Sequence, residues 1–147
     1  DLPKSPRTSV TWGDTRVLWL SIDQWLVLTT ADKAGALTTA LRNALGGIHS
    51  MATNVSDMRA VIRVEGPGAR VALLKGSSLD LLSGEYEAGT VRRMRFAEIA
   101  ALLHVVEDDV FDIYVFRSYA DYAWNFLLAT CKDAAAVQLF GRQAVPL

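Results

Sequence analysis

The chain of 147 residues contains a single cysteine, Cys131, so it cannot form an intrachain disulfide. This scarcity is typical of a reducing compartment, and we expect a cytoplasmic location. Long hydrophobic runs are also missing, since residues 99–103 and 126–129 fall far short of the ~20 residues that cross a bilayer. The first residues, Asp1-Leu2-Pro3-Lys4, lack the apolar core of a signal peptide. We therefore expect a soluble protein that is not exported and has no membrane partner.

An excess of charge of one sign is absent as well. The 15 basic and 16 acidic residues give a formal net charge of -1. A protein that binds polyanions usually carries a clear positive field, which concentrates phosphates at its surface. The charge balance therefore indicates no nucleic-acid partner.

Apolar residues, by contrast, are plentiful. Hydrophobic residues make up 51% of the chain, the mean hydropathy is positive and there are four tryptophans. A domain of this size can hide them in a rich private core or present some of them to another chain. Trp12 and Trp19 are our candidates for a contact surface, whereas Trp25 and Trp124 fit a core equally well.

The first half of the chain predicts a hairpin followed by a helix. Residues 1–9 have no hydrophobic period and predict an arm that is disordered or lies on a partner, with structure starting near Trp12 and a single domain over residues 10–147. Apolar runs at 16–20 and 24–29 surround a turn and predict two antiparallel strands. A helix is then expected from an N-cap at Asp32 to the glycines at 46–47.

The second half repeats this order. Strands are expected at 99–106 and 111–116, followed by a helix that starts with a capping box of Ser118 and Asp121. Between the halves, residues 61–64 predict a central strand, Pro67 the first turn of a helix that ends at Lys75-Gly76, and residues 90–96 another strand. The pattern predicts an α+β fold in which helices cover one face of the sheet.

The side chains that usually carry chemistry are few and scattered. Neither His49 nor His104 has a second ligand at a metal-binding spacing, so we predict structural roles for both. Lys132 stands beside Cys131 and would lower a thiol pKa, but a cysteine buried in an apolar helix is an inert packing residue. We predict no nucleophile there.

Three polar motifs resemble sites without completing one. The turn at residues 66–70 follows a strand and opens a helix, but it lacks both the dinucleotide and the P-loop fingerprints. The acids at 107–109 lack calcium-loop spacing and predict a solvated hairpin turn. Arg92, Arg93 and Arg95 fit a protected sheet edge or a pairing with a partner's acids. We therefore predict no catalytic, cofactor-binding or metal-binding residue in this chain.

Three segments together resemble a known family. They are residues 57–70, with Glu65-Gly66-Pro67-Gly68, residues 74–81, with Lys75-Gly76-Ser77-Ser78-Leu79-Asp80-Leu81, and residues 111–120, with Arg117-Ser118-Tyr119-Ala120. In this order they are similar to the gamma subunit of heterotetrameric sarcosine oxidase, from about Trp25 to Leu128. Ser77 stands where many relatives are expected to carry cysteine, which argues against a required thiol.

The resemblance implies a ferredoxin-like fold similar to the folate-binding domain of the glycine-cleavage aminomethyltransferase. It also implies a structural subunit without its own cofactor, assembled with an alpha subunit (NAD, tetrahydrofolate), a beta subunit (FAD, FMN) and a delta subunit (zinc). The complex would oxidise sarcosine to glycine, form hydrogen peroxide and pass the methyl carbon to tetrahydrofolate. Two alternatives stay open: a subunit of a related N-methyl amino acid dehydrogenase, such as one for N-methylglutamate, and a stand-alone folate or small-ligand module.

Overall fold

The structure of this chain is a computed structural model that describes residues 2–132. The chain divides into two compact units, Asp1–Met58 and Arg59–Leu147. It is a mixed α/β protein in which each unit has one antiparallel sheet and each sheet is followed by a helix. A single domain over residues 10–147 stays a prediction, and its last part, residues 133–147, lies outside the described residues.

The first unit is a three-stranded antiparallel sheet followed by a helix. Its elements are β1 (Ser9–Trp12), β2 (Thr15–Ser21), β3 (Gln24–Leu28) and α1 (Ala31–Leu45). The predicted hairpin is confirmed: β2 and β3 pair antiparallel, with Trp19 opposite Trp25 and a register shift between Trp19 and Ser21. Alternating side chains place these two rings on the same face of the sheet.

The segment before β1 contacts the same hairpin. The indole N–H of Trp25 donates to the carbonyl oxygen of Pro3 at 3.3 Å, and the backbone N–H of Trp19 donates to that of Thr8 at 3.0 Å. Regular structure begins at Ser9, three residues before the predicted start at Trp12. An arm over residues 1–9 with its own role stays a prediction.

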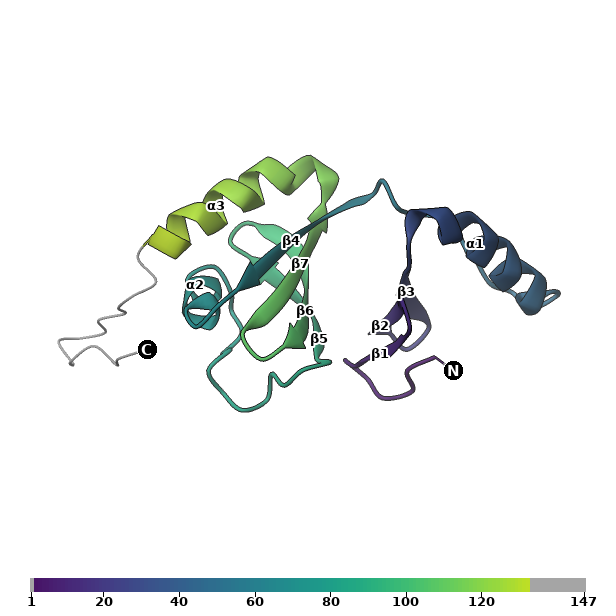
Figure 1. Cartoon of the computed structure of the whole chain (residues 1–147), viewed down its shortest axis with the longest axis horizontal. Helices are drawn as coiled ribbons and strands as arrows, with labels where there is room; N and C mark the ends of the chain where they lie inside the picture. The colour runs from purple at the N-terminus through teal and green to yellow at the C-terminus, as the bar shows by residue number, and fades with distance from the viewer. Residues whose placement is uncertain (1, 133–147) are drawn as a thin grey trace. The chain divides into compact units, whose positions relative to one another are not determined.

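Helix α1 begins two residues earlier than predicted. Thr30 is its N-cap, and Thr30 makes no side-chain capping bond. Asp32 lies in the first turn instead, where a carboxylate stabilises the positive end of the helix dipole. The predicted end is confirmed, because Gly46, with φ of 49°, donates its N–H to the carbonyl of Arg42. Figure 1 shows α1 leaving the end of β3 and extending away from the three-stranded sheet.

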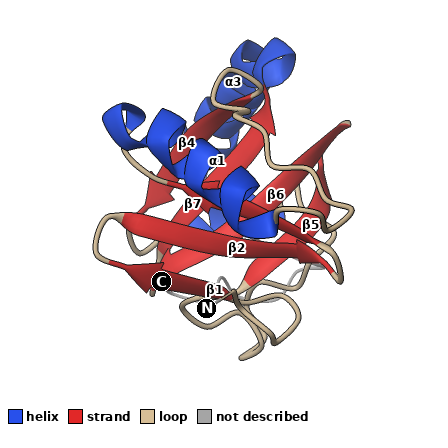
Figure 2. Cartoon of the chain, turned by 90° about the vertical axis from the view of Figure 1, so that its right-hand side faces the viewer, coloured by secondary structure: helices blue, strands red, loops and turns tan. Residues whose placement is uncertain are grey.

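The second unit holds most of the buried core. Its elements are β4 (Arg59–Glu65), α2 (Ala69–Leu74), β5 (Val91–Phe96), β6 (Ile99–Glu107), β7 (Val110–Phe116), a 3₁₀ turn (Arg117–Tyr119) and α3 (Ala120–Lys132). The four strands lie side by side in the order β4-β7-β6-β5 (Figure 2). Helices α2 and α3 lie on the same side of this sheet (Figure 1) and close one hydrophobic core. Its fully buried members include Leu73, Leu81, Phe96, Leu103, Phe111, Ile113 and Val115.

The prediction of a central strand at residues 61–64 is wrong, because β4 forms one edge of the sheet. Three apolar residues in four positions suggest burial on both faces. In the structure only Ile62 and Val64 face the core, whereas Val61 keeps 51% of its surface exposed. The central strands are β7 and β6, which begin much later in the chain, at Val110 and Ile99.

The starts of α2 and α3 also differ from prediction. Pro67 precedes α2, whose N-cap is Gly68, because the turn is closed by a bond from the Ala69 N–H to the carbonyl of Gly66. Ser118 lies inside the 3₁₀ turn rather than at a helix cap. Tightened first turns of this kind are common, and sequence signals locate them only to within a residue or two.

Candidate functional site: an arginine clamp and exposed aromatic side chains

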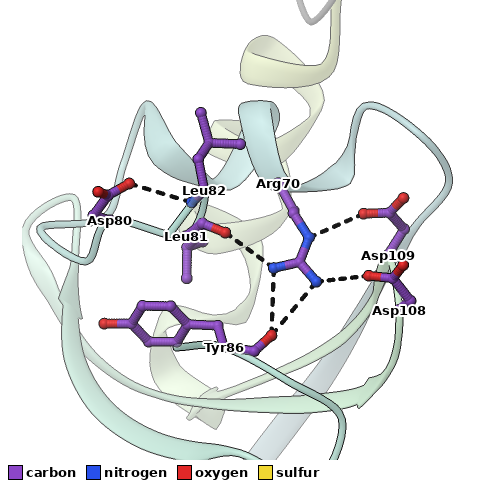
Figure 3. A network of polar contacts seen from close by, with 7 residues as sticks. All are labelled: Arg70, Asp80, Leu81, Leu82, Tyr86, Asp108 and Asp109. Carbon is purple, nitrogen blue, oxygen red and sulfur yellow. Dashed lines mark hydrogen bonds and ion pairs between the residues drawn. The ribbon is translucent and has the colours of Figure 1, made fainter. Parts of the chain in front are cut away.

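The most connected polar group of the second unit is Arg70, on α2. Its Nε donates to Asp109 at 3.1 Å and its Nη2 to Asp108 at 2.8 Å, on the turn between β6 and β7. Its Nη1 donates to the carbonyl of Leu81 at 2.9 Å, and both terminal nitrogens approach that of Tyr86 at 3.4 Å. Figure 3 shows the guanidinium between the two acids on one side and the loop carbonyls on the other. We call this arrangement the arginine clamp.

The clamp joins three segments and leaves Arg70 little capacity for a ligand. The rigid, planar fork of a guanidinium suits several acceptors at once. The Arg70 side chain is 19% exposed, and it also stacks over the Phe111 ring at 5.2 Å. The hairpin turn at 107–109 is confirmed, but Asp108 and Asp109 are ion-pair partners of Arg70 and not merely solvated acids.

The glycine turn before α2 is occupied by its own hydrogen bonds. The N–H of Gly66 donates to the carbonyl of Asp109 at 3.0 Å, and the N–H of Ala72 to that of Gly68. Helix α2 is only six residues long. Gly66 has φ of 110°, a conformation that glycine adopts without strain. The turn connects strand and helix tightly, as the sequence indicated.

A row of polar side chains crosses the sheet on the face away from the helices. Arg63, on β4, donates to both carboxylate oxygens of Asp112 at 2.8 and 3.0 Å, and Asp112 lies opposite His104 in the ladder. His104 is 2% exposed and Asp112 is 5% exposed. The hydrogen bond and the negative charge of Asp112 raise the pKa of the Arg63 guanidinium above its ordinary value. The sequence analysis missed this row, because its members are 8 to 49 residues apart and only strand pairing aligns them.

The remaining candidates are separated from one another. His49 is exposed in the loop after α1. Cys131 is exposed near the end of α3, so the prediction of a buried packing cysteine is wrong. The buried face of α3 carries Ala123, Leu127 and Thr130, and residue 131 is turned about 100° from the last of these.

The basic patch lies on β5, the other edge of the four-stranded sheet, as one of our two readings predicted. Arg95 pairs with Glu98 in the following turn, and Arg93 is exposed. Arg92 lies over the Tyr86 ring, with its guanidinium carbon 5.4 Å from the centroid. Exposed arginines of this kind discourage the pairing of another strand.

Exposed aromatic side chains occur at the end of β7, on the 3₁₀ turn and on α3 of the second unit. Phe116, Tyr119, Tyr122 and Trp124 each keep 40–53% of their surface exposed. Leu128 lies one helical turn after Trp124 and is also exposed, so α3 carries an apolar strip on its outer face. Trp124 therefore does not belong to the core. In the first unit, Trp12 is exposed to 47%, whereas Trp19 and Trp25 are partly buried.

Two further observations concern residues 2–132. No group of three or more histidine, cysteine, aspartate or glutamate side chains in this range is arranged to hold a metal ion. Nor does any helix in the same range have both the length and the apolar character to span a bilayer.

Comparison with known proteins identifies the family. The model of the "Sarcosine oxidase, gamma subunit family" matches residues 1–136, which include all of the first compact unit and most of the second. The chain belongs to this family. The segments that suggested the resemblance, residues 57–70, 74–81 and 111–120, lie within the matched range.

A named relative and a solved structure similar to this gamma-family chain come from one bacterium. Sarcosine oxidase subunit gamma of Corynebacterium sp. (strain U-96) is 27% identical over 125 residues, which are 85% of this chain and 60% of that protein. The chain thus spans less than two thirds of that relative's length. A solved chain of the heterotetrameric sarcosine oxidase from Corynebacterium sp. U-96, in complex with pyrrole 2-carboxylate, has a TM-score of 0.82 at 25% identity, covering 94% of this chain and 70% of that chain.

Proposed function

We propose that this chain is the gamma subunit of a heterotetrameric sarcosine oxidase and supports the other subunits without a reacting group of its own. The family match over residues 1–136 carries this proposal. The geometry supports it, because Arg70 donates its hydrogen bonds to acceptors within this chain and Arg63 binds Asp112 of the same sheet. A reacting centre needs groups that converge on a substrate.

The chemistry of the proposed complex lies in the partner subunits. We assign NAD and tetrahydrofolate to a large alpha subunit, FAD and FMN to a beta subunit and zinc to a small delta subunit. Sarcosine would be oxidised to glycine, oxygen reduced to hydrogen peroxide and the methyl carbon passed to tetrahydrofolate in the cytoplasm. The gamma chain would contribute no catalytic, cofactor-binding or metal-binding residue.

The finer fold assignment belongs to the same proposal. The order strand, turn, strand, helix occurs twice, as β2-β3-α1 and as β6-β7-α3. This repeat supports a ferredoxin-like relationship to the folate-binding domain of the glycine-cleavage aminomethyltransferase. We also propose that residues 10–147 act as one family domain, because the match to the solved chain extends over 94% of the sequence.

The exposed aromatic side chains are the proposed contact with the larger subunits. Tryptophan and tyrosine bury a large area for little loss of side-chain entropy and are frequent anchors of interfaces. Trp124 and its neighbour Leu128 present such an area on α3, and Trp12 presents one on β1. Trp19 is less accessible, because it pairs with Trp25 across the hairpin.

Replacing Trp124 by alanine should weaken assembly far more than it weakens the fold. We expect at least a tenfold loss of affinity for the partner subunits, which corresponds to about 1.4 kcal/mol. The free energy of unfolding should change by about 0.5 kcal/mol or less, since the side chain is half exposed. Titration of the purified chain into the partner subunits measures the affinity, and urea unfolding measures the free energy of unfolding.

Trp124→Phe, which keeps an aromatic anchor, is the matched control and should bind within about threefold of the native chain. Equal affinities for the alanine variant and the native chain would remove α3 from the interface.

Co-expression with the genes of the flavin-binding subunits tests the assignment itself. We expect one complex that contains this chain, absorbs as a flavoprotein and consumes oxygen when sarcosine is added. Activity with N-methylglutamate and an acceptor other than oxygen would replace sarcosine oxidase by the related dehydrogenase. A colourless chain that does not bind the large subunits, and whose binding to folate is measured by calorimetry, would contradict the proposal and favour the small-ligand module.

A further inference from the structure

Strand β4 leaves one edge of the four-stranded sheet open. It pairs with β7 on one side and is the last strand of the order β4-β7-β6-β5. The bond from the Gly66 N–H to the Asp109 carbonyl sets the phase of this ladder. Residues that bond to β7 alternate along β4 with residues that do not, and the register has no break. Since Gly66 bonds toward β7, residues 59, 61, 63 and 65 point their N–H and C=O groups away from it. Within residues 59–132, the described part of the second unit, the structure gives these outward groups no hydrogen bond.

The other strand edges are shorter or already protected. On the opposite side of the same sheet, β5 is bridged by Ser77 beside Phe96, and its exposed Arg93 and Arg95 carry charge of one sign, whereas the exposed residues of β4 include both Arg63 and Glu65. In the first unit, β1 has four residues and β3 has five, against seven in β4. A long edge with unsatisfied backbone groups is a template for another strand.

The sequence of β4 is complementary to itself when two copies run antiparallel. With Ile62 opposite Ile62 of a second copy, Arg59 lies opposite Glu65 at both ends of the ladder. This register also matches the hydrogen bonds, because the outward-pointing residues 59, 61, 63 and 65 then face one another. Opposite charges directly across a ladder stabilise the pair, whereas like charges destabilise it.

The surroundings of Arg59 favour a carboxylate in this position. Its guanidinium carbon lies 4.8 Å above the Phe116 ring, and the described part of the second unit, residues 59–132, gives this group no carboxylate partner. Partial burial and the nearby positive charge of Arg93 lower the pKa of Arg59 below its ordinary value. A glutamate from a second copy would supply the missing negative charge.

We propose that the chain, when free of partner subunits, forms a symmetric dimer by antiparallel pairing of β4 with β4 of a second copy about Ile62. The two four-stranded sheets then continue into one. A single strand pair is small for an interface, so we expect a dissociation constant on the order of 100 µM. The dimer would shield an aggregation-prone edge until the chain assembles. The pairing goes beyond the proposed function and does not depend on it; its shielding role before assembly rests on the proposed function.

Sedimentation equilibrium of the full chain tests the pairing from ~10 µM to ~1 mM. We expect a reversible monomer–dimer equilibrium that Glu65→Arg weakens at least tenfold, because each end of the ladder then holds two arginines. The double variant Arg59→Glu/Glu65→Arg restores opposite charges and should recover most of the affinity. Val61→Pro removes an outward N–H and should abolish the dimer without unfolding an edge strand.

Glu98→Arg is the matched control, since it makes the same charge change at the exposed turn between β5 and β6. Circular dichroism of every variant establishes that it is folded. A monomer at all concentrations, or a dimer that Glu65→Arg and Glu98→Arg affect equally, would overturn the pairing. A dimer lost in Trp124→Ala but kept in Val61→Pro would move the contact to α3. None of these results bears on the flavoprotein complex, which co-expression tests separately.

Discussion

Gly76→Ala is expected to destabilise the second unit by about 3 kcal/mol, as overpacking a filled core does. A β-carbon at position 76 would lie 2.6 Å from Cε1 of Phe126 and 2.8 Å from Cε2 of Phe96. These two rings pack edge to face with centroids 5.3 Å apart, and Phe96 is fully buried. Phe96 cannot withdraw without opening the core, and Phe126 is partly buried against that core.

Urea unfolding of the full chain measures this loss, and hydrogen exchange of the β6 and β7 amides assigns it to the second unit. Gly84→Ala is the matched control in the same unit, because nothing lies within 4 Å of its β-carbon. We expect that control to change the free energy of unfolding by about 0.5 kcal/mol or less. If both variants unfold at the same urea concentration, the close packing at Gly76 is wrong.

Arg70→Met is expected to cost about 3 kcal/mol and to release the loop between α2 and β5. The cost comes mainly from the carbonyls of Leu81 and Tyr86, which belong to buried residues and lose their charged donor. The pair with Asp108 adds little, since that carboxylate is 89% exposed. Methionine keeps the aliphatic packing, so the variant isolates the polar contacts.

The free energy of unfolding and the rate of proteolysis between residues 79 and 87 measure the two effects. Arg70→Lys keeps one charge without the fork and should fall between the native chain and Arg70→Met. Arg95→Met is the matched control, because it breaks an exposed ion pair with Glu98 and should change stability by about 0.5 kcal/mol or less. A loop cleaved equally fast in the Arg70 and Arg95 variants would contradict the clamp.

Local patterns predicted most of the elements. The hairpin of β2 and β3, the hairpin of β6 and β7, and strand β5 lie within about a residue of their expected bounds. Alternating apolar residues interrupted by a short polar turn leave few other conformations with a buried face. The helix starts were less accurate, because Asp32 and Ser118 fit the chemistry of a cap as well as that of the first turn.

Local sequence patterns did not predict the order of the strands in the sheet. Residues 61–64 look like a central strand, yet β7 takes that place and leaves β4 at the edge. Which strand pairs with which is decided by contacts between residues far apart in the chain, and the entropy of closing those loops carries no local signature.

The candidate site shows the same division. The sequence by itself was enough to place the chain in the gamma-subunit family, because residues 57–70, 74–81 and 111–120 are local motifs that occur together in this order. The partners of Arg70 are 11 to 39 residues away, and Asp112 is 49 residues from Arg63. The tertiary structure decided these contacts, the exposure of Trp124 and the open edge of β4. Each depends on how the sheet and helices pack, and this packing is set by contacts between residues that are far apart in the sequence.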